Sequence, residues 1–199
     1  MINKRMNMDI SNISVVILSG GKSSRMGQPK ALLQIGEKRF VDYLAESFSE
    51  AGEVLFSVKE AGDFPDVVLP HIVDDFPGCG PLAGIHSSLK NAKNPWVFIV
   101  ACDTPFVKKE TLETMMQFCS DDITAVIPKE EDGRLHVLCG LYHRSTLPKI
   151  EKYLKEGNYR VRSIFDSDHA VFLSVKKCFN DTKAFRNVNT PEDYKEMVQ

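Results

Sequence analysis

Residues 15–33 read VVILSGGKSSRMGQPKALL, and this stretch decides the fold. The apolar run Val15–Leu18 stops at Ser19-Gly20-Gly21, which is typical of a buried strand that ends in a glycine-rich loop. Glycine has no Cβ, so the backbone of such a loop can approach a polyphosphate and direct N–H donors at it. The loop also carries three cations: Lys22, Arg25 and Lys30. The stretch predicts a strand of an α/β sheet followed by a phosphate-binding loop; the alternative is a glycine-rich turn with solvated surface cations.

Two better-known phosphate-binding loops do not match this stretch. A Walker A loop needs a glycine five residues before its Gly-Lys-Ser, and Val16 occupies that place before Gly21. The dinucleotide-binding fingerprint G-x-G-x-x-G needs a spacing that Gly20, Gly21 and Gly27 do not have. The sequence therefore excludes a P-loop enzyme and a Rossmann dehydrogenase.

The remaining pattern, L-x-G-G-x-S-x-R-M-G-x-x-K over residues 18–30, resembles the signature loop of nucleotidyltransferases. With Gly-Gly at its centre, it is most similar to the molybdenum cofactor guanylyltransferases (MobA family). The resemblance implies that Arg25 and Lys30 are catalytic cations that hold the triphosphate, whereas Lys22 is more typical of a solvent-facing side chain. It also implies a set of nucleotide-binding residues: Leu18, Ser19, Gly20, Gly21, Lys30, Asp74 and Asp103.

Composition limits the class of protein. A chain of 199 residues with 43% hydrophobic and 26% charged residues suits one globular domain. The net charge of −2 gives no global basic field, so no nucleic-acid partner is expected. The five cysteines include no C-x-x-C pair, which favours reduced thiols. The polar N-terminus has no apolar signal region, and no apolar run is long enough for a membrane span, so a cytoplasmic protein is expected.

Apolar periodicity predicts an alternating α/β fold. Strands are expected at 15–18, 54–58, 67–73, 96–101, 124–127, 136–141 and 170–175. Helices are expected at 40–48, 109–119 and 146–155, with further helices that begin at Pro81 and Pro191. The segment GRLHVLCGLYH (133–143) is expected to pair antiparallel, which gives a mixed sheet. These elements predict one three-layer α/β/α domain over 13–199, with a mostly parallel Rossmann-like sheet, behind a loose N-terminal arm over 1–12. The resemblance implies the nucleotide-diphospho-sugar transferase type of this fold.

Two carboxylates follow predicted strands. Asp103 stands after the most apolar strand, where ligands of open α/β sheets gather, and one carboxylate beside substrate phosphates is enough to hold Mg²⁺. The alternative is a backbone cap, which Asp-x-Pro sequences often form. The resemblance of C-D-T-P-F (102–106) to a family segment implies that Asp103 is the catalytic metal ligand. Asp74, followed by the family-like GCGPLAG (78–84), resembles the aspartate that contacts the nucleotide. Ser57 departs from relatives that can have Asn there, which leaves its nucleotide contact open.

The C-terminal octet R-N-V-N-T-P-E-D (186–193) resembles the close of the guanylyltransferases. It implies that Asn187 and Asn189 face the second substrate or the metal-bound phosphates, although Asn-Thr-Pro is also an ordinary helix-capping sequence. The segment GNYRVR (157–162) resembles a basic segment thought to receive the pterin, which makes Arg160 a weaker candidate.

The resemblance implies a reaction. The terminal phosphate of (molybdenum-loaded) molybdopterin would attack the α-phosphorus of GTP, release pyrophosphate and form molybdopterin guanine dinucleotide with Mg²⁺ as cofactor. Transient contacts with molybdopterin-delivering proteins and molybdoenzymes would follow. Two alternatives stay open: another nucleotidyltransferase, such as a CTP:molybdopterin cytidylyltransferase or a sugar-phosphate NMP transferase, and a non-catalytic cofactor carrier.

Overall fold

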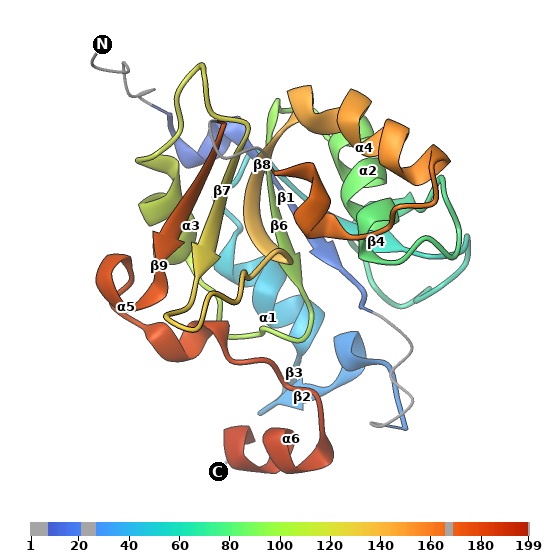
Figure 1. The fold of residues 1–199 in the computed structure, drawn as a ribbon. Coiled ribbons are helices and arrows are strands. Elements are labelled where there is room, and N and C mark those ends of the chain that lie inside the picture. The colour runs from blue at the N-terminus through green and yellow to red at the C-terminus, as the bar shows by residue number, and fades with distance from the viewer. Residues whose placement is uncertain (1–7, 21–26, 166–168, 199) are drawn as a thin grey trace.

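A mixed sheet forms the centre of the computed structural model, which describes residues 8–20, 27–165 and 169–198 (Figure 1). Its seven strands lie in the order β5-β4-β1-β6-β8-β7-β9. The strands are β1 (Ile13–Leu18), β4 (Glu53–Val58), β5 (His71–Val73), β6 (Trp96–Ala101), β7 (Ala125–Lys129), β8 (Cys139–His143) and β9 (Ala170–Ser174). The helices are α1 (Phe40–Ser47), α2 (Pro81–Asn91), α3 (Lys109–Met116), α4 (Leu147–Lys155), α5 (Val175–Cys178) and α6 (Pro191–Val198).

The directions of the strands show which edge of the sheet can bind a ligand. β1 pairs in parallel with β4 and β6, and β4 pairs in parallel with β5. β8 is antiparallel to both β6 and β7, and β7 is parallel to β9. The predicted mixed sheet is thus confirmed, with β8 as its reversed strand. The other strands all end at the same edge, where open α/β sheets bind their ligands.

Helices cover both faces of the sheet, as the three-layer prediction requires (Figure 1). The odd positions of β1, Val15 and Ile17, pack with α1 and α3, whereas Val16 and Leu18 pack with α2 and α4. Because β1 and β6 are buried on both faces, β6 is continuously apolar and β1 is apolar except for Ser14, rather than alternating.

A small unit below the sheet was not predicted. The two-residue strands β2 (Gln34–Ile35) and β3 (Lys38–Arg39) form a hairpin, and α6 packs on it through a separate apolar cluster (Figure 1). The Tyr194 hydroxyl donates a 2.7 Å hydrogen bond to the Gln34 carbonyl. Strands this short carry no readable periodicity, so only tertiary packing reveals the hairpin.

Several predicted boundaries were wrong. The strand expected over 67–73 is reduced to the edge strand β5, because Pro70 has no N–H for the ladder. The strand expected over 136–141 is β8, shifted toward the C-terminus, since Cys139 donates to the His136 carbonyl in a turn. The helix expected over 109–119 ends at Met116.

The N-terminal arm expected over 1–12 falls largely outside the described residues. Its last part is ordered: Ile10–Asn12 form the 3₁₀ turn η1, which Asp9 caps. Met8 and Ile10 pack against the core.

The remaining 3₁₀ turns are η2 (Lys30–Leu32), η3 (Arg144–Thr146), η4 (Val161–Ile164) and η5 (Thr182–Phe185). Within the described residues, every helix is too short or too polar to traverse a lipid bilayer.

Candidate functional site

The loop after β1 leaves the sheet between its two neighbouring strands. The Ser19 N–H donates to the Ser57 carbonyl of β4 at 3.0 Å, and the Leu18 carbonyl accepts from Cys102 N–H beyond β6 at 3.1 Å. Gly20 then turns the chain with a φ of 89°, a conformation that strains other residues. The predicted nucleotide residues Leu18, Ser19 and Gly20 therefore stand at the carboxyl edge of the sheet. Gly21, Lys22 and Arg25 lie outside the described residues.

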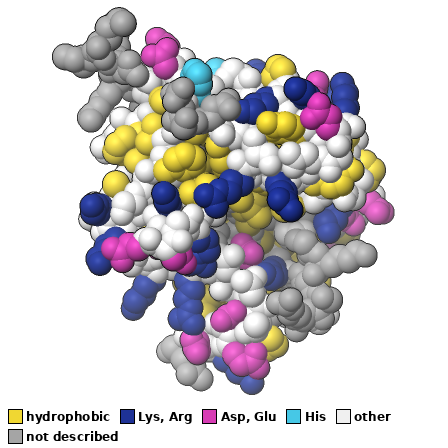
Figure 2. All heavy atoms as spheres, viewed as in Figure 1, with side chains coloured by type: hydrophobic (Ala, Val, Ile, Leu, Met, Phe, Trp, Pro, Cys, Tyr) yellow, Lys and Arg dark blue, Asp and Glu magenta, His cyan; other side chains and the backbone are white. Residues whose placement is uncertain are grey.

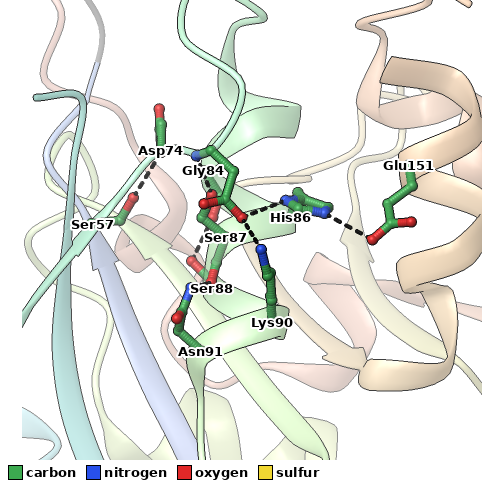
Figure 3. A network of polar contacts seen from close by, with 10 residues as sticks. Ser57, Asp74, Gly84, His86, Ser87, Ser88, Lys90, Asn91 and Glu151 are labelled. Carbon is green, nitrogen blue, oxygen red and sulfur yellow. Dashed lines mark hydrogen bonds and ion pairs between the residues drawn. The ribbon is translucent and has the colours of Figure 1, made fainter. Parts of the chain in front are cut away.

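Asp74 is fixed beside this loop from the β4 side. Its backbone N–H donates to the Val58 carbonyl at 3.1 Å, and the Ser57 hydroxyl donates to its carboxylate at 3.4 Å (Figure 3). Partial burial raises the pKa of Asp74, and the hydrogen bond from Ser57 acts against that shift. Ser57 thus acts on the carboxylate of Asp74, a role that the sequence left open.

The start of α2 completes this side of the edge. Gly80 forms the N-cap with a φ of 69°, and no side chain caps the helix. Pro81 has no N–H and the Ala83 N–H donates to the Gly80 carbonyl at 3.1 Å, so Leu82 supplies the first-turn N–H that a ligand could accept from; the helix dipole favours an anion there. Gly84 lets α2 approach the strands closely: a Cβ at this position would lie 3.3 Å from Leu18 Cδ2 and 3.6 Å from Asp74 Oδ1. Gly84 belongs to the motif GCGPLAG (78–84), but the motif alone does not indicate this contact.

Three side chains from distant parts of the chain meet beyond β6. Lys30 Nζ, on η2, lies 3.5 Å from the carboxylate of Asp103 and donates a 2.6 Å hydrogen bond to Asn189 Oδ1. The Val188 N–H donates to the Asp103 carbonyl at 2.7 Å, which holds the C-terminal segment against the edge. The structure therefore brings together the predicted residues Lys30, Asp103 and Asn189.

The donor set of this cluster suits a hard divalent cation. The Asp103 side chain is 20% exposed, so its carboxylate can reach a ligand, and the 3.5 Å contact with Lys30 is a loose one. Among the described residues, no group of three or more His, Cys, Asp or Glu side chains converges. Mg²⁺ is commonly held by one or two carboxylates together with substrate phosphates and water, so the residues present fit it.

The structure confirms the helix cap that the C-terminal octet allows. Asp193 accepts hydrogen bonds from the N–H groups of Asn189 and Thr190, each at 2.9 Å, and the Thr190 hydroxyl accepts from Asp193 N–H at 3.1 Å. These bonds lower the pKa of Asp193. Thr190 and Asp193 cap α6, and the Asn189 side chain is directed to Lys30 instead.

A pocket of about 330 Å³ adjoins Asn189 on the side of β7 and β8. It is lined by Glu130, Arg134, Thr182, Phe185, Arg186, Asn187, Asn189 and Asp193. On this face of the molecule, Lys and Arg side chains form a band above α6, with Asp and Glu side chains among them (Figure 2). The pocket residues of the β7–β8 loop were missed, because no local motif marks them; their one signal is that they follow a strand ending at the same edge.

Arg160 lies elsewhere. It precedes η4, which packs with α2 and α4, and its side chain is exposed. The neighbouring Tyr159 hydroxyl hydrogen-bonds with the Cys79 thiol, which raises the pKa of the tyrosine. Within the described part of the chain, no hydrogen bond or ion pair joins Arg160 to Asn187 or Asn189.

Sequence comparisons point to one family. The model of the MobA-like NTP transferase domain matches residues 15–171. A protein of Halalkalibacterium halodurans named "Probable molybdenum cofactor guanylyltransferase" is 34% identical, and the alignment covers 92% of this chain and 96% of the relative. A Geobacillus protein of the same name is 30% identical over 95% of this chain and 100% of its own length.

Solved structures agree with this family. The crystal structure of molybdopterin-guanine dinucleotide biosynthesis protein A from Archaeoglobus fulgidus superposes with a TM-score of 0.78 at 25% identity, over 92% of this chain and 95% of that one. The 2-C-methyl-D-erythritol 4-phosphate cytidylyltransferase of Thermus thermophilus shares the fold, with a TM-score of 0.66 at 16% identity over 92% of this chain and 96% of that one.

Proposed function

The chain belongs to the MobA-like NTP transferase family, and from this premise we propose that it transfers GMP from GTP to the terminal phosphate of molybdopterin. The products would be pyrophosphate and molybdopterin guanine dinucleotide. The observation that carries the proposal is the cluster of Lys30, Asp103 and Asn189, because Asn189 both accepts from Lys30 and lines the pocket. Two anionic substrates can therefore meet at one cluster.

The nucleotide would occupy the side formed by β1, β4 and α2. Gly20 would present its backbone N–H group to the phosphates, and the Leu82 N–H in the first turn of α2 would add a second donor. Asp74, ionised, can accept hydrogen bonds from N–H groups of a purine edge.

The second substrate would enter from the pocket beyond Asn189. Its volume of about 330 Å³ suits a bicyclic pterin. Arg134 and Arg186 supply positive charge for an anionic substrate, and Glu130 offers a carboxylate to its N–H edge. Asn189 contacts Lys30 and also lines the pocket, so it lies where the two substrates would meet.

The chemistry needs no protein base, because an ionised phosphate is already a nucleophile. Lys30 would neutralise charge on the phosphates as pyrophosphate departs, and Asn189 would fix the direction of its ammonium group. Asp103, with the triphosphate, would hold Mg²⁺, which when bound supplies Lewis-acid stabilisation of phosphate charge. The protein would otherwise contribute to catalysis by positioning the two substrates.

A transfer assay tests the proposal. The purified chain is incubated with Mg²⁺, molybdenum-loaded molybdopterin and GTP, CTP, ATP or UTP separately, and both pyrophosphate and the pterin dinucleotide are measured. Product with GTP alone is expected. Product with CTP instead would overturn the guanylyl assignment and keep the nucleotidyl transfer. Pterin binding without turnover by any nucleotide would favour a cofactor carrier.

A further inference from the structure

His86 is a buried histidine of α2 that lies outside the groups proposed to touch substrate. Its side chain is 2% exposed, and a carboxylate faces each of its ring nitrogens (Figure 3). Nε2 lies 3.3 Å from Glu151 Oε1 on α4, and Nδ1 lies 3.7 Å from Asp75 Oδ2 in the loop after β5. Among the described residues, Nδ1 has no hydrogen-bond partner. A buried polar atom in that state requires an explanation.

Imidazole chemistry explains why the two sides differ. A neutral ring has one N–H and one lone pair, so it can donate to only one of the two carboxylates. The shorter contact belongs to Glu151, and 3.7 Å is beyond a normal hydrogen bond. The bond to Asp75 is therefore not made while the ring donates to Glu151. It needs the tautomer with the N–H on Nδ1 and a movement of about 0.5 Å, which would bring the two atoms within hydrogen-bond distance.

The same face of α2 holds the loop around Asp75 in three further ways. The Asp75 N–H donates to the Ser87 hydroxyl at 2.9 Å, and its carboxylate accepts from Lys90 Nζ at 2.8 Å. The ring of Phe76 packs edge-on against His86, with centroids 4.9 Å apart and an interplanar angle of 88°. His86 is thus the buried centre of a contact that fixes residues 75–76.

These residues directly follow Asp74 and precede the glycine turn at the start of α2. Asp74 is held from the other side by β4, through the Val58 carbonyl and the Ser57 hydroxyl. We infer that His86 is a positioning residue for nucleotide binding: acting through Asp75 and Phe76, it holds Asp74 and the turn at residues 77–80 in the arrangement that the nucleotide requires. This inference rests on the proposed function, since it takes that side of the sheet as the nucleotide site.

Three substitutions at His86 separate its contacts. His86→Phe keeps the ring and its packing on Phe76 but removes both nitrogens. His86→Asn places an amide near the Nδ1 position, toward Asp75, whereas His86→Gln places one near Nε2, toward Glu151. Because the inference requires the ring to donate from Nδ1 to Asp75 when the nucleotide is bound, His86→Phe is expected to raise the Kd and KM for GTP about tenfold, with kcat within about twofold of wild type. His86→Asn should recover most of the affinity, and His86→Gln should not.

Partner variants give the matched control. Asp75→Asn lies at the surface and should fold; it is expected to raise the Kd for GTP and to be non-additive with His86→Phe. Glu151→Gln alters the other ring contact, from α4, and should leave the Kd unchanged. The inference is overturned if His86→Phe lowers only the melting temperature, or if Glu151→Gln weakens GTP binding as much as His86→Phe does.

Failure of the proposed function would look different. If wild-type protein binds CTP or another nucleotide instead of GTP, the guanylyl assignment fails, and the same variants are compared with that nucleotide. If wild-type protein binds no nucleoside triphosphate in an equilibrium assay, both the proposed function and the role of His86 are overturned.

Discussion

The ammonium group of Lys30 lies 3.5 Å from the carboxylate of Asp103, although 73 positions separate the two residues in the chain. Lys30 belongs to η2, after the glycine-rich loop, and Asp103 follows the buried strand β6. Both side chains are largely covered, at 14% and 20% exposure, so solvent screens their interaction less than that of a surface pair. The fold thus places a cation and a carboxylate next to each other at the carboxyl edge of the sheet.

Asp103→Asn is the first prediction. The amide keeps the size of the side chain but loses the negative charge that would bind Mg²⁺ beside the phosphates. We expect kcat for GMP transfer to fall by about 10²-fold or more. The melting temperature should change little, because the backbone carbonyl of Asp103, which accepts from Val188 N–H, is unaffected by the substitution. A variant that retains most of its activity in Mg²⁺ titrations would contradict the assignment.

Lys30→Met tests the cation. The substitution keeps an unbranched chain in a largely covered position and removes the charge that neutralises departing pyrophosphate. We expect a loss of about 10²-fold in kcat in the same assay. Lys30→Arg should restore activity only in part, because a planar guanidinium does not fit the 2.6 Å contact with Asn189. The matched control is Lys38→Met, which breaks an exposed ion pair with Glu46 and should leave activity unchanged; equal losses in both lysine variants would remove the special role of Lys30.

The elements with strong local signals could be predicted from the sequence. The apolar runs Val15–Leu18 of β1 and Trp96–Ala101 of β6 are continuous because both faces of each strand are buried, and α6 begins where Thr190 and Pro191 indicate. Asp103 was chosen because it follows a strand that ends at the ligand-binding edge, whereas Asp74 was chosen because the stretch 78–84 resembles the family.

Contacts between distant segments could not be predicted in the same way. Asn189 and Lys30 are 159 positions apart, and no periodicity in either segment indicates that they meet. The β2–β3 hairpin, the register of β8 and the pocket beside Asn187 likewise depend on packing. The resemblance implied roles for the two asparagines, and the structure shows that Asn189 contacts Lys30.

Gly84→Ala tests the close approach of α2 to the strands. The added methyl group would lie 3.3 Å from Leu18 Cδ2 and 3.4 Å from Ser57 Oγ, which is tighter than ordinary van der Waals contact. The helix must shift away from β1 and β4, and the space and hydrogen bonds around Asp74 change with it. We expect a several-fold higher Kd for GTP, measured by calorimetry, and a loss of stability of about 1–3 kcal/mol. An unchanged Kd in the folded variant would show that the nucleotide does not depend on this contact.

Arg134→Gln tests the pocket proposed for the second substrate. Its ion pair with Glu130 spans 3.8 Å at an exposed site, so its loss should hardly affect stability. We expect the KM for molybdopterin to rise about tenfold, the effect of losing one charge-assisted hydrogen bond, while the Kd for GTP stays constant. Lys152→Gln is the control, since it breaks a similar exposed ion pair on α4, away from the pocket. A parallel rise in the KM for both substrates would place Arg134 in the nucleotide site instead.

The Asp74→Asn variant tests how the stability of the protein depends on pH. Burial raises the pKa of Asp74 in the folded protein above its ordinary value of 3.8, so the fold favours the protonated form. The stabilising contribution of this group is therefore complete below pH 3.8 and is lost as the pH rises through the folded-state pKa. At pH 7 the wild-type carboxylate is ionised in a half-buried position, whereas the amide is neutral and can still accept from Ser57. We expect the variant to melt at a higher temperature than wild type at pH 7, to lose that advantage near pH 3, and to bind GTP more weakly at pH 7. A lower melting temperature of Asp74→Asn at pH 7 would mean that hydrogen bonding, rather than burial, dominates the environment of this carboxylate.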